Sequence, residues 1–74
     1  NSALYSGYTK HVSLSELVPG DLLFYSYKGT ISTIHHITIY AGGGMMWEAN
    51  SKGKGLLYSN IYSVKGLMPF GGRV

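Results

Sequence analysis

The chain has 74 residues, 45% of them hydrophobic and 12% charged, which allows one small domain and excludes an intrinsically disordered segment. It contains no cysteine, so a disulfide framework and a thiolate metal site are both excluded. The net charge of +3 comes from scattered Lys and Arg residues, which predicts no nucleic-acid-binding patch, and no apolar run approaches the roughly 18 residues of a membrane span.

The first predicted element is a short helical turn that leads into a strand. Ser13–Glu16 has the spacing of a capping box, so Leu14–Val18 is expected to form one turn of helix. Pro19-Gly20 ends the turn, and Asp21 is expected to be a turn carboxylate with a structural role. The apolar run Leu22–Tyr27 then predicts a strand that is mostly buried on both faces.

The clearest strand runs from Ile34 to Ala41 and returns through a hairpin. The glycines Gly42–Gly44 give the backbone freedom for the turn, and Met45–Ala49 is the predicted partner strand. Side chains alternate along a strand, so successive residues are expected on opposite faces. One face carries His35, Ile37, Ile39 and Ala41, and the other carries His36, Thr38 and Tyr40.

The hairpin fixes where Glu48 lies relative to His36. If the three glycines form the loop, Ala41 pairs with Met45. Thr38 then lies opposite Glu48, and Glu48 shares a face with His36 at a diagonal step of roughly 7 to 8 Å. A carboxylate within reach of an imidazole fixes its tautomer and stabilises the imidazolium. A two-residue turn would instead move Glu48 to the opposite face.

The rest of the chain carries weaker signals. Ser51–Gly55 predicts a polar loop, and Leu56–Tyr58 and Leu67–Phe70 are candidate strands. There is no internal repeat and no low-complexity tract. These segments complete a compact, sheet-rich prediction.

The residues by themselves form an incomplete hydrolytic site. A histidine with an acidic partner needs a nucleophile for acyl transfer, but the chain has no cysteine and no serine in a Gly-x-Ser-x-Gly elbow. A metal site is not expected either, because His35 and His36 point to opposite faces and His11 is remote from both in sequence. The sequence therefore indicates one part of a catalytic constellation.

Four segments carry a further signal, namely Pro19–Tyr25 (PGDLLFY), His36–Gly44 (HITIYAGGG), Met46–Ala49 (MWEA) and Gly71–Val74 (GGRV). In this order and spacing they resemble the C-terminal half of the NlpC/P60 family of papain-like cysteine peptidases, from about Leu14 to the C-terminus. The resemblance implies an α+β fold. Residues 1–74 would form a single partial domain that supplies antiparallel sheet and one short helical turn.

The resemblance also implies roles for two residues. His36 falls at the family's general base, and Glu48 falls at the third residue, which orients the imidazole. That third position is usually His, Asn or Gln, so the carboxylate is a departure that would hold an imidazolium more strongly. Thr38 stands where the family usually has Gly. The family's nucleophilic Cys lies well upstream, and Ser2 and Ser6 are too close to the strand to replace it.

The implied function is hydrolysis of an amide bond in peptidoglycan stem peptides, often the D-γ-glutamyl-diaminopimelate bond, by a cysteine supplied from an upstream segment. No metal or organic cofactor is implied, and the implied location is secreted or in the cell envelope. The chain is expected to be one part of a split or cleaved domain, a truncated product or a degenerate, inactive member. One apolar sheet face is expected to be exposed and to bind the missing half or a second copy.

Two other classes of function are compatible with the residues. A non-catalytic cell-wall binding module with a small SH3-like β fold would use the same short strands, glycines and tyrosines. A lipid or acyl-transfer relative would use a similar Cys-His core. His36 discriminates between binding and catalysis, because a binding module tolerates its replacement by alanine.

Overall fold

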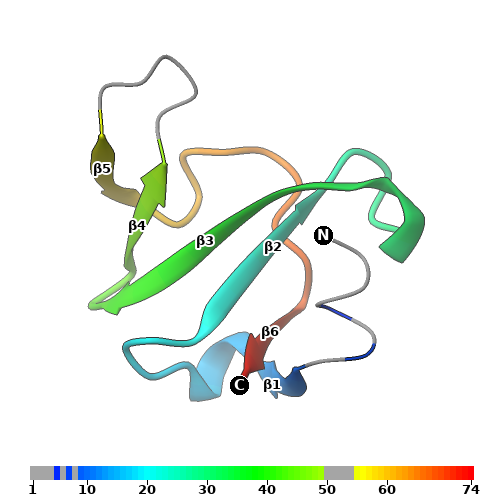
Figure 1. Cartoon of the computed structure of the whole chain (residues 1–74), viewed down its shortest axis with the longest axis horizontal. Helices are drawn as coiled ribbons and strands as arrows, with labels where there is room; N and C mark the ends of the chain where they lie inside the picture. The colour runs from blue at the N-terminus through cyan, green and yellow to red at the C-terminus, as the bar shows by residue number, and fades with distance from the viewer. Residues whose placement is uncertain (1–4, 6, 8, 50–54) are drawn as a thin grey trace.

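The computed structural model describes residues 5, 7, 9–49 and 55–74, which form one six-stranded antiparallel sheet (Figure 1). The strands are β1 (Lys10–Ser13), β2 (Leu22–Ser26), β3 (Ile34–Gly42), β4 (Met45–Ala49), β5 (Leu56–Asn60) and β6 (Phe70–Arg73). Their spatial order is β1-β6-β2-β3-β4-β5, so the C-terminal strand lies between β1 and β2. No helical segment of the described residues is long and apolar enough to span a membrane.

The predicted sheet is confirmed, but the predicted helical turn is shorter than expected. In place of a turn over Leu14–Val18, the chain forms a single 3-10 turn, η2 (Leu14–Glu16). Ser13 caps no backbone group with its side chain and instead donates to the Glu16 carboxylate at 3.0 Å. The capping-box residues therefore contact each other through their side chains alone.

The C-terminal strand is displaced from its predicted position. β6 begins at Phe70, where the strand expected over Leu67–Phe70 ends. Leu67 instead forms an isolated bridge with Tyr25 at the edge of β2. β1 and a second 3-10 turn, η3 (Ile31–Thr33), have no counterpart in the sequence predictions. Of the polar loop expected over Ser51–Gly55, residues 51–54 lie outside the described residues.

The connection from β5 to β6 crosses one face of the sheet. Residues 61–69 leave β5 at one edge and reach β6 beside β2, as the orange segment in Figure 1 shows. Ile61 of this connection packs against Leu23, Tyr25 and Met46, and these four side chains form a buried core. The face that they occupy is termed the crossover face. The buried cluster on the opposite face is formed by Tyr5, Phe24 and Met68.

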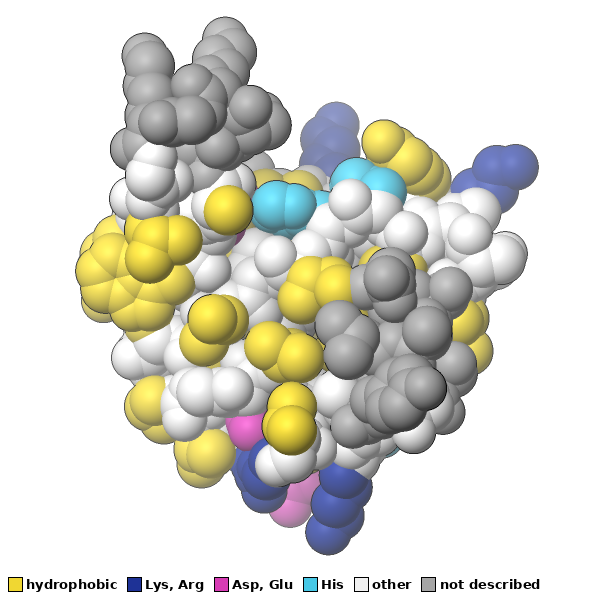
Figure 2. Space-filling model, in the orientation of Figure 1, with side chains coloured by type: hydrophobic (Ala, Val, Ile, Leu, Met, Phe, Trp, Pro, Cys, Tyr) yellow, Lys and Arg dark blue, Asp and Glu magenta, His cyan; other side chains and the backbone are white. Residues whose placement is uncertain are grey.

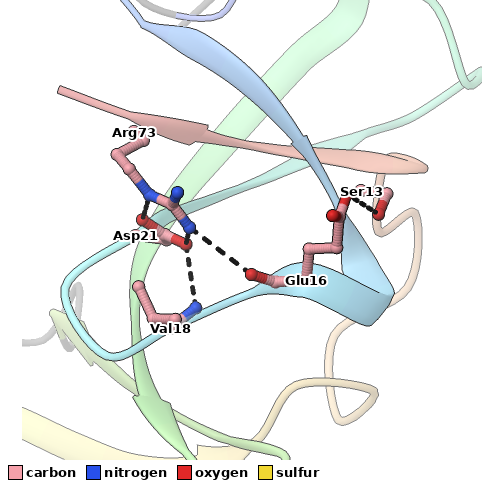
Figure 3. A network of polar contacts seen from close by, with 5 residues as sticks. All are labelled: Ser13, Glu16, Val18, Asp21 and Arg73. Carbon is pink, nitrogen blue, oxygen red and sulfur yellow. Dashed lines mark hydrogen bonds and ion pairs between the residues drawn. The ribbon is translucent and has the colours of Figure 1, made fainter.

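An ion pair between a buried carboxylate and a partly exposed guanidinium ties the start of β2 to β6 (Figure 3). Arg73 donates from Nε and Nη2 to the two carboxylate oxygens of Asp21 at 2.9 and 2.8 Å. The Val18 amide donates to the same carboxylate at 2.9 Å, and Asp21 is only 2% exposed. The Arg73 hydrogen bonds hold the pKa of Asp21 below its usual range, with help from the Val18 amide and against the effect of burial. The structural role expected for Asp21 is thereby confirmed.

Replacing Asp21 with Asn is predicted to lower the free energy of unfolding at neutral pH by about 2 kcal/mol, because the charge-assisted hydrogen bonds are lost. The lowered pKa means that this stabilisation is present above the unfolded-state pKa of about 3.9 and is lost as the pH falls through the folded-state pKa. Urea unfolding of both proteins between neutral and acidic pH measures the difference, which is expected to close in acid.

Glu16→Gln is the matched control for Asp21→Asn, because the Glu16 side chain bonds Ser13 and Arg73 reaches only its backbone carbonyl. Its free energy of unfolding is expected to stay within about 0.5 kcal/mol of the wild-type value. An equal loss in both variants, or a loss in Asp21→Asn that is the same at every pH, would contradict this account of the ion pair.

Candidate active site

His36 lies near the start of β3 on the crossover face, directly opposite Tyr25 of β2. Its side chain is 28% exposed. Together with Ile34, His35 and Ile37 it lines an open pocket of about 320 Å³. Figure 2 shows histidine side chains at the surface near the upper edge of the molecule. One side of the His36 imidazole is therefore packed, while the other side is accessible to a reacting group.

The turn between β3 and β4 differs from the predicted one. Gly42 pairs with Met45, so Gly43-Gly44 forms a two-residue turn. The φ angles of these two glycines are +62° and +79°, and both positive values suit the tight turns that join twisted antiparallel strands. The predicted pairing of Ala41 with Met45 is therefore wrong.

A bulge at Ala41 nevertheless leaves Glu48 on the predicted face. Beyond this extra residue Tyr40 pairs with Met46, which is the register that a three-residue loop would have set. The two-residue turn alone would have moved Glu48 away from His36. The bulge offsets the one-residue register shift that the short turn causes. His36 and Glu48 therefore share a face as predicted, although the turn differs from the predicted loop.

His36 and Glu48 are in contact. The Nε2 atom of His36 lies 3.2 Å from Oε1 of Glu48, whose side chain is 13% exposed. An ionised carboxylate accepts a proton donor, so Nε2 carries hydrogen and Nδ1 is left as the basic nitrogen. The pair can therefore accept a proton at Nδ1 while the carboxylate stabilises the resulting imidazolium.

The buried ring of Tyr25 lies beneath this pair and is termed the floor of the site. The ring of Tyr25 is 0% exposed, and its centroid lies 5.7 Å from that of His36. The phenol donates to the carbonyl of Ile61 at 2.7 Å and lies 3.0 Å from the sulfur of Met46. Burial raises the pKa of Tyr25 to about 12, against a lowering interaction with the Thr38 side chain, and the negative charge of Glu48 adds to the rise. The phenol therefore remains protonated at neutral pH.

Thr38 is a second buried polar residue on the crossover face. It pairs with Leu23 of β2 and is 2% exposed. Its hydroxyl oxygen has no hydrogen-bond partner among the described residues. The hydroxyl thus forms no hydrogen bond of regular geometry, although its closeness to the Tyr25 phenol lowers the pKa of Tyr25.

Of the other two histidines, only His35 lies beside this site. The expectation that His35 and His36 point to opposite faces is wrong, because the β2–β3 register shifts by one residue at His35. The His35 ring stacks on Tyr27 with the centroids 3.8 Å apart, and its centroid lies 6.5 Å from that of His36. His11 packs against Tyr5 at a centroid distance of 4.3 Å. In the part of the chain that the structure describes, no group of three or more His, Cys, Asp or Glu side chains is placed to hold a metal ion. Ser2 and Ser6 lie outside that part.

The His36–Glu48 pair could be predicted from the sequence, but the position of the Tyr25 ring beneath it was not. Tyr25 was predicted only as part of a buried strand, and no sequence signal pairs its hydroxyl with Ile61, 36 residues further on. An antiparallel pairing of the strands that contain Tyr25 and His36 would have placed the two rings together. Their separation by a short loop was the available signal for that pairing.

The fold and the site define an antiparallel sheet domain that presents a histidine–carboxylate pair beside an open pocket. The profile of the NlpC/P60 family matches residues 1–66 of the chain. The chain therefore belongs to the NlpC/P60 family.

Relatives of known name are consistent with this membership. The chain is 40% identical over 47 residues to the gamma-D-glutamyl-L-lysine dipeptidyl-peptidase of Bacillus subtilis, covering 64% of this chain and 16% of that protein. It is 44% identical over 62 residues to the probable endopeptidase p60 of Listeria seeligeri, covering 84% and 11%. It is 41% identical over 59 residues to the bifunctional muramidase/DL-endopeptidase CwlT of Bacillus subtilis, covering 77% and 17%.

A solved structure shares the fold. The peptidoglycan hydrolase RipB of Mycobacterium tuberculosis superimposes with a TM-score of 0.67 at 32% identity, over 88% of this chain and 30% of the RipB chain. The antiparallel sheet predicted from the resemblance is thus the sheet of an NlpC/P60 domain. The chain spans less than a fifth of the length of the three named relatives and about a third of RipB.

Thr38→Val is predicted to raise the free energy of unfolding by up to about 1 kcal/mol, because a methyl group replaces a buried hydroxyl of similar size that forms no hydrogen bond of regular geometry. Thr38→Ser, which keeps the hydroxyl and loses the methyl, is expected to lower it by about 1 kcal/mol. Urea unfolding of the three proteins measures both effects. A clear loss of stability in Thr38→Val would show that the hydroxyl is paired and would contradict the prediction.

Proposed function

We propose that this chain carries the histidine part of a peptidoglycan stem-peptide hydrolase, with His36 as the general base and Glu48 as the residue that orients it. The single observation that supports this best is the 3.2 Å contact between His36 Nε2 and Glu48 Oε1 beside the open pocket. Membership of the NlpC/P60 family and the activities named for its relatives supply the substrate class.

The proposed nucleophile is a cysteine from a segment outside these 74 residues, because the chain itself has none. Its thiol gives a proton to His36 Nδ1, and the sulfur bonds to the carbonyl carbon of the scissile amide. The carbon–nitrogen bond then breaks as the imidazolium returns the proton to the leaving amine. Water hydrolyses the thioester with His36 again as base, while Glu48 stabilises the imidazolium in both steps.

The stem-peptide amide that fits this proposal is one on the D-glutamyl side, often D-γ-glutamyl-diaminopimelate. The relatives named as a gamma-D-glutamyl-L-lysine dipeptidyl-peptidase and a DL-endopeptidase support that class. No metal or organic cofactor takes part in the proposed chemistry. Such a substrate places the protein in the cell envelope or outside the cell.

The partner that supplies the cysteine has an apolar surface to bind. Ile39, Trp47 and Tyr58 on the opposite face are 47%, 43% and 55% exposed, and the rings of Trp47 and Tyr58 are in contact. The pocket at His36 is lined from both faces, since it includes Ile34 and Ile37, which pack against the opposite-face cluster, as well as His36. We propose that the segment with the cysteine reaches Nδ1 through this pocket. The chain by itself is proposed to self-associate through the same surface.

His36→Ala is predicted to lower kcat/KM for muropeptides at least about 1,000-fold in the assembled domain, because general acid–base catalysis is lost. Glu48→Gln is predicted to lower it only about tenfold, since an amide still orients the ring without stabilising its charge. Mass spectrometry of digested muropeptides measures both rates. His11→Gln, a substitution remote from the pair, is the control and is expected to stay within twofold of the wild-type protein.

The same assay separates the main alternative. A cell-wall binding module would keep its affinity for peptidoglycan in His36→Ala and would release no peptide in any variant. Hydrolysis that survives in His36→Ala would overturn the proposed role of this residue. Activity on acyl esters with none on muropeptides would instead favour an acyl-transfer relative.

Self-association is predicted for the isolated 74-residue chain at high micromolar concentration. Sedimentation equilibrium is expected to give a mass above that of the monomer, and the double substitution Trp47→Ser/Tyr58→Ser is expected to restore the monomer mass by removing exposed aromatic area. Tyr62→Ser, at another exposed tyrosine, serves as the control. A monomeric wild-type chain would count against the proposed surface, unless denaturing mass spectrometry of the native sample reveals a second, cysteine-containing polypeptide on it.

A further inference from the structure

We infer that Tyr25 is a positioning residue for the His36–Glu48 pair, and that its hydroxyl holds the ring in place beneath the two side chains. This inference rests on the proposed function, and it assigns Tyr25 no contact with substrate. Four sets of contacts made by Tyr25 support it.

The first contact is with the imidazole itself. Tyr25 and His36 are directly opposite in the β2–β3 register, and their rings are inclined at 48° with centroids 5.7 Å apart. Tyr25 is fully buried, whereas the His36 side chain is 28% exposed. The packed side of the imidazole thus lies over a ring that cannot move without disrupting the core. A fixed floor of this kind restricts the rotation of the imidazole above it.

The second contact is with the strand that carries Glu48. The Tyr25 hydroxyl lies 3.0 Å from the sulfur of Met46, and Met46 is two residues before Glu48 on the same face of β4. Tyr25 therefore contacts β3 through His36 and β4 through Met46. A side chain that contacts both strands on one face helps to fix the distance between the Nε2 and Oε1 atoms of the pair.

The remaining contacts anchor the tyrosine to the connection that crosses the sheet. The hydroxyl donates to the carbonyl of Ile61 at 2.7 Å, and the Ile61 amide donates to the carbonyl of Gly44 in the hairpin turn at 3.0 Å. The backbone of Tyr25 forms a bridge with Leu67. Because the pKa of the phenol is raised to about 12, this donor persists throughout the pH range in which an imidazole works as a base. The floor is therefore held at the hydroxyl as well as along the strand.

Tyr25→Phe tests the inference, because it removes the hydroxyl and keeps the ring. In the assembled domain it is expected to lower kcat for muropeptides about tenfold and to change KM less than twofold, as a positioning defect does. In the 74-residue chain, held below the concentration at which it self-associates, long-range nitrogen–proton NMR spectra of the His36 ring are expected to show a smaller fraction of the Nε2-protonated tautomer. 4-Aminophenylalanine at position 25, which keeps a donor, is expected to restore both readouts.

Tyr40→Phe is the matched control. The Tyr40 hydroxyl also bonds a backbone group on this face, the amide of Gly44 at 3.1 Å, but it lies in the hairpin away from His36. It is expected to leave kcat, and the fraction of His36 in the Nε2-protonated tautomer, within twofold of the wild-type values. An unchanged His36 spectrum in Tyr25→Phe, or equal changes in Tyr25→Phe and Tyr40→Phe, would overturn the inference.

The two readouts keep this inference separate from the proposed function. The NMR experiment needs no cysteine and no substrate, so it tests the role of Tyr25 even if the assembled domain hydrolyses nothing. Loss of hydrolysis in His36→Ala together with an unperturbed ring in Tyr25→Phe would retain the proposed function and reject the positioning role. A perturbed His36 ring in Tyr25→Phe, together with intact hydrolysis in His36→Ala, would retain the positioning role and reject the proposed function. If Tyr25→Phe unfolds at the assay temperature, the 4-aminophenylalanine variant is compared directly with the wild-type chain, and a spectrum without the Nε2-protonated tautomer would overturn the inference.

Discussion

The register between β3 and β4 is the constraint on which the whole site depends. The side-chain period of a strand is two, so a slip of one residue in β4 would turn Glu48 away from His36 and bring Trp47 to the crossover face. The two-residue Gly43-Gly44 turn would cause that slip by itself, and the bulge at Ala41 reverses it. The 3.2 Å contact of the pair is therefore a consequence of two compensating irregularities at the tip of the hairpin.

The ion pair that stabilises the sheet lies apart from the groups that are proposed to react. The Asp21–Arg73 ion pair closes the sheet at the junction of β2 and β6, while His36 sits near the start of β3 beside the pocket. Tyr25 lies between these regions as a fully buried residue whose hydroxyl is bonded to the crossover connection. The Asp21–Arg73 ion pair thus holds β2 and β6 together, and the Tyr25 ring restricts the position of His36 on the sheet.

The central hairpin could be predicted from the sequence, because alternation and three consecutive glycines are local signals. The face shared by His36 and Glu48 followed from the same pattern, although the assumed loop was wrong. β6 could not be predicted, since it contains Gly71 and Gly72, residues that disfavour strands in general. Their use here is steric, because a Cβ at Gly71 would lie 2.7 Å from the Leu22 carbonyl oxygen.

The pairing of β1 with β6 and the bond from Tyr25 to Ile61 join residues that are far apart in sequence, so no local pattern reports them.

The most direct test of the account is a crystal structure of the assembled domain, in which the distance from the cysteine sulfur to the two nitrogens of His36 is measured. The account predicts the sulfur within about 4 Å of Nδ1, with Nε2 still on Glu48. A sulfur against Nε2, or on a face from which Nδ1 cannot be reached, would contradict it.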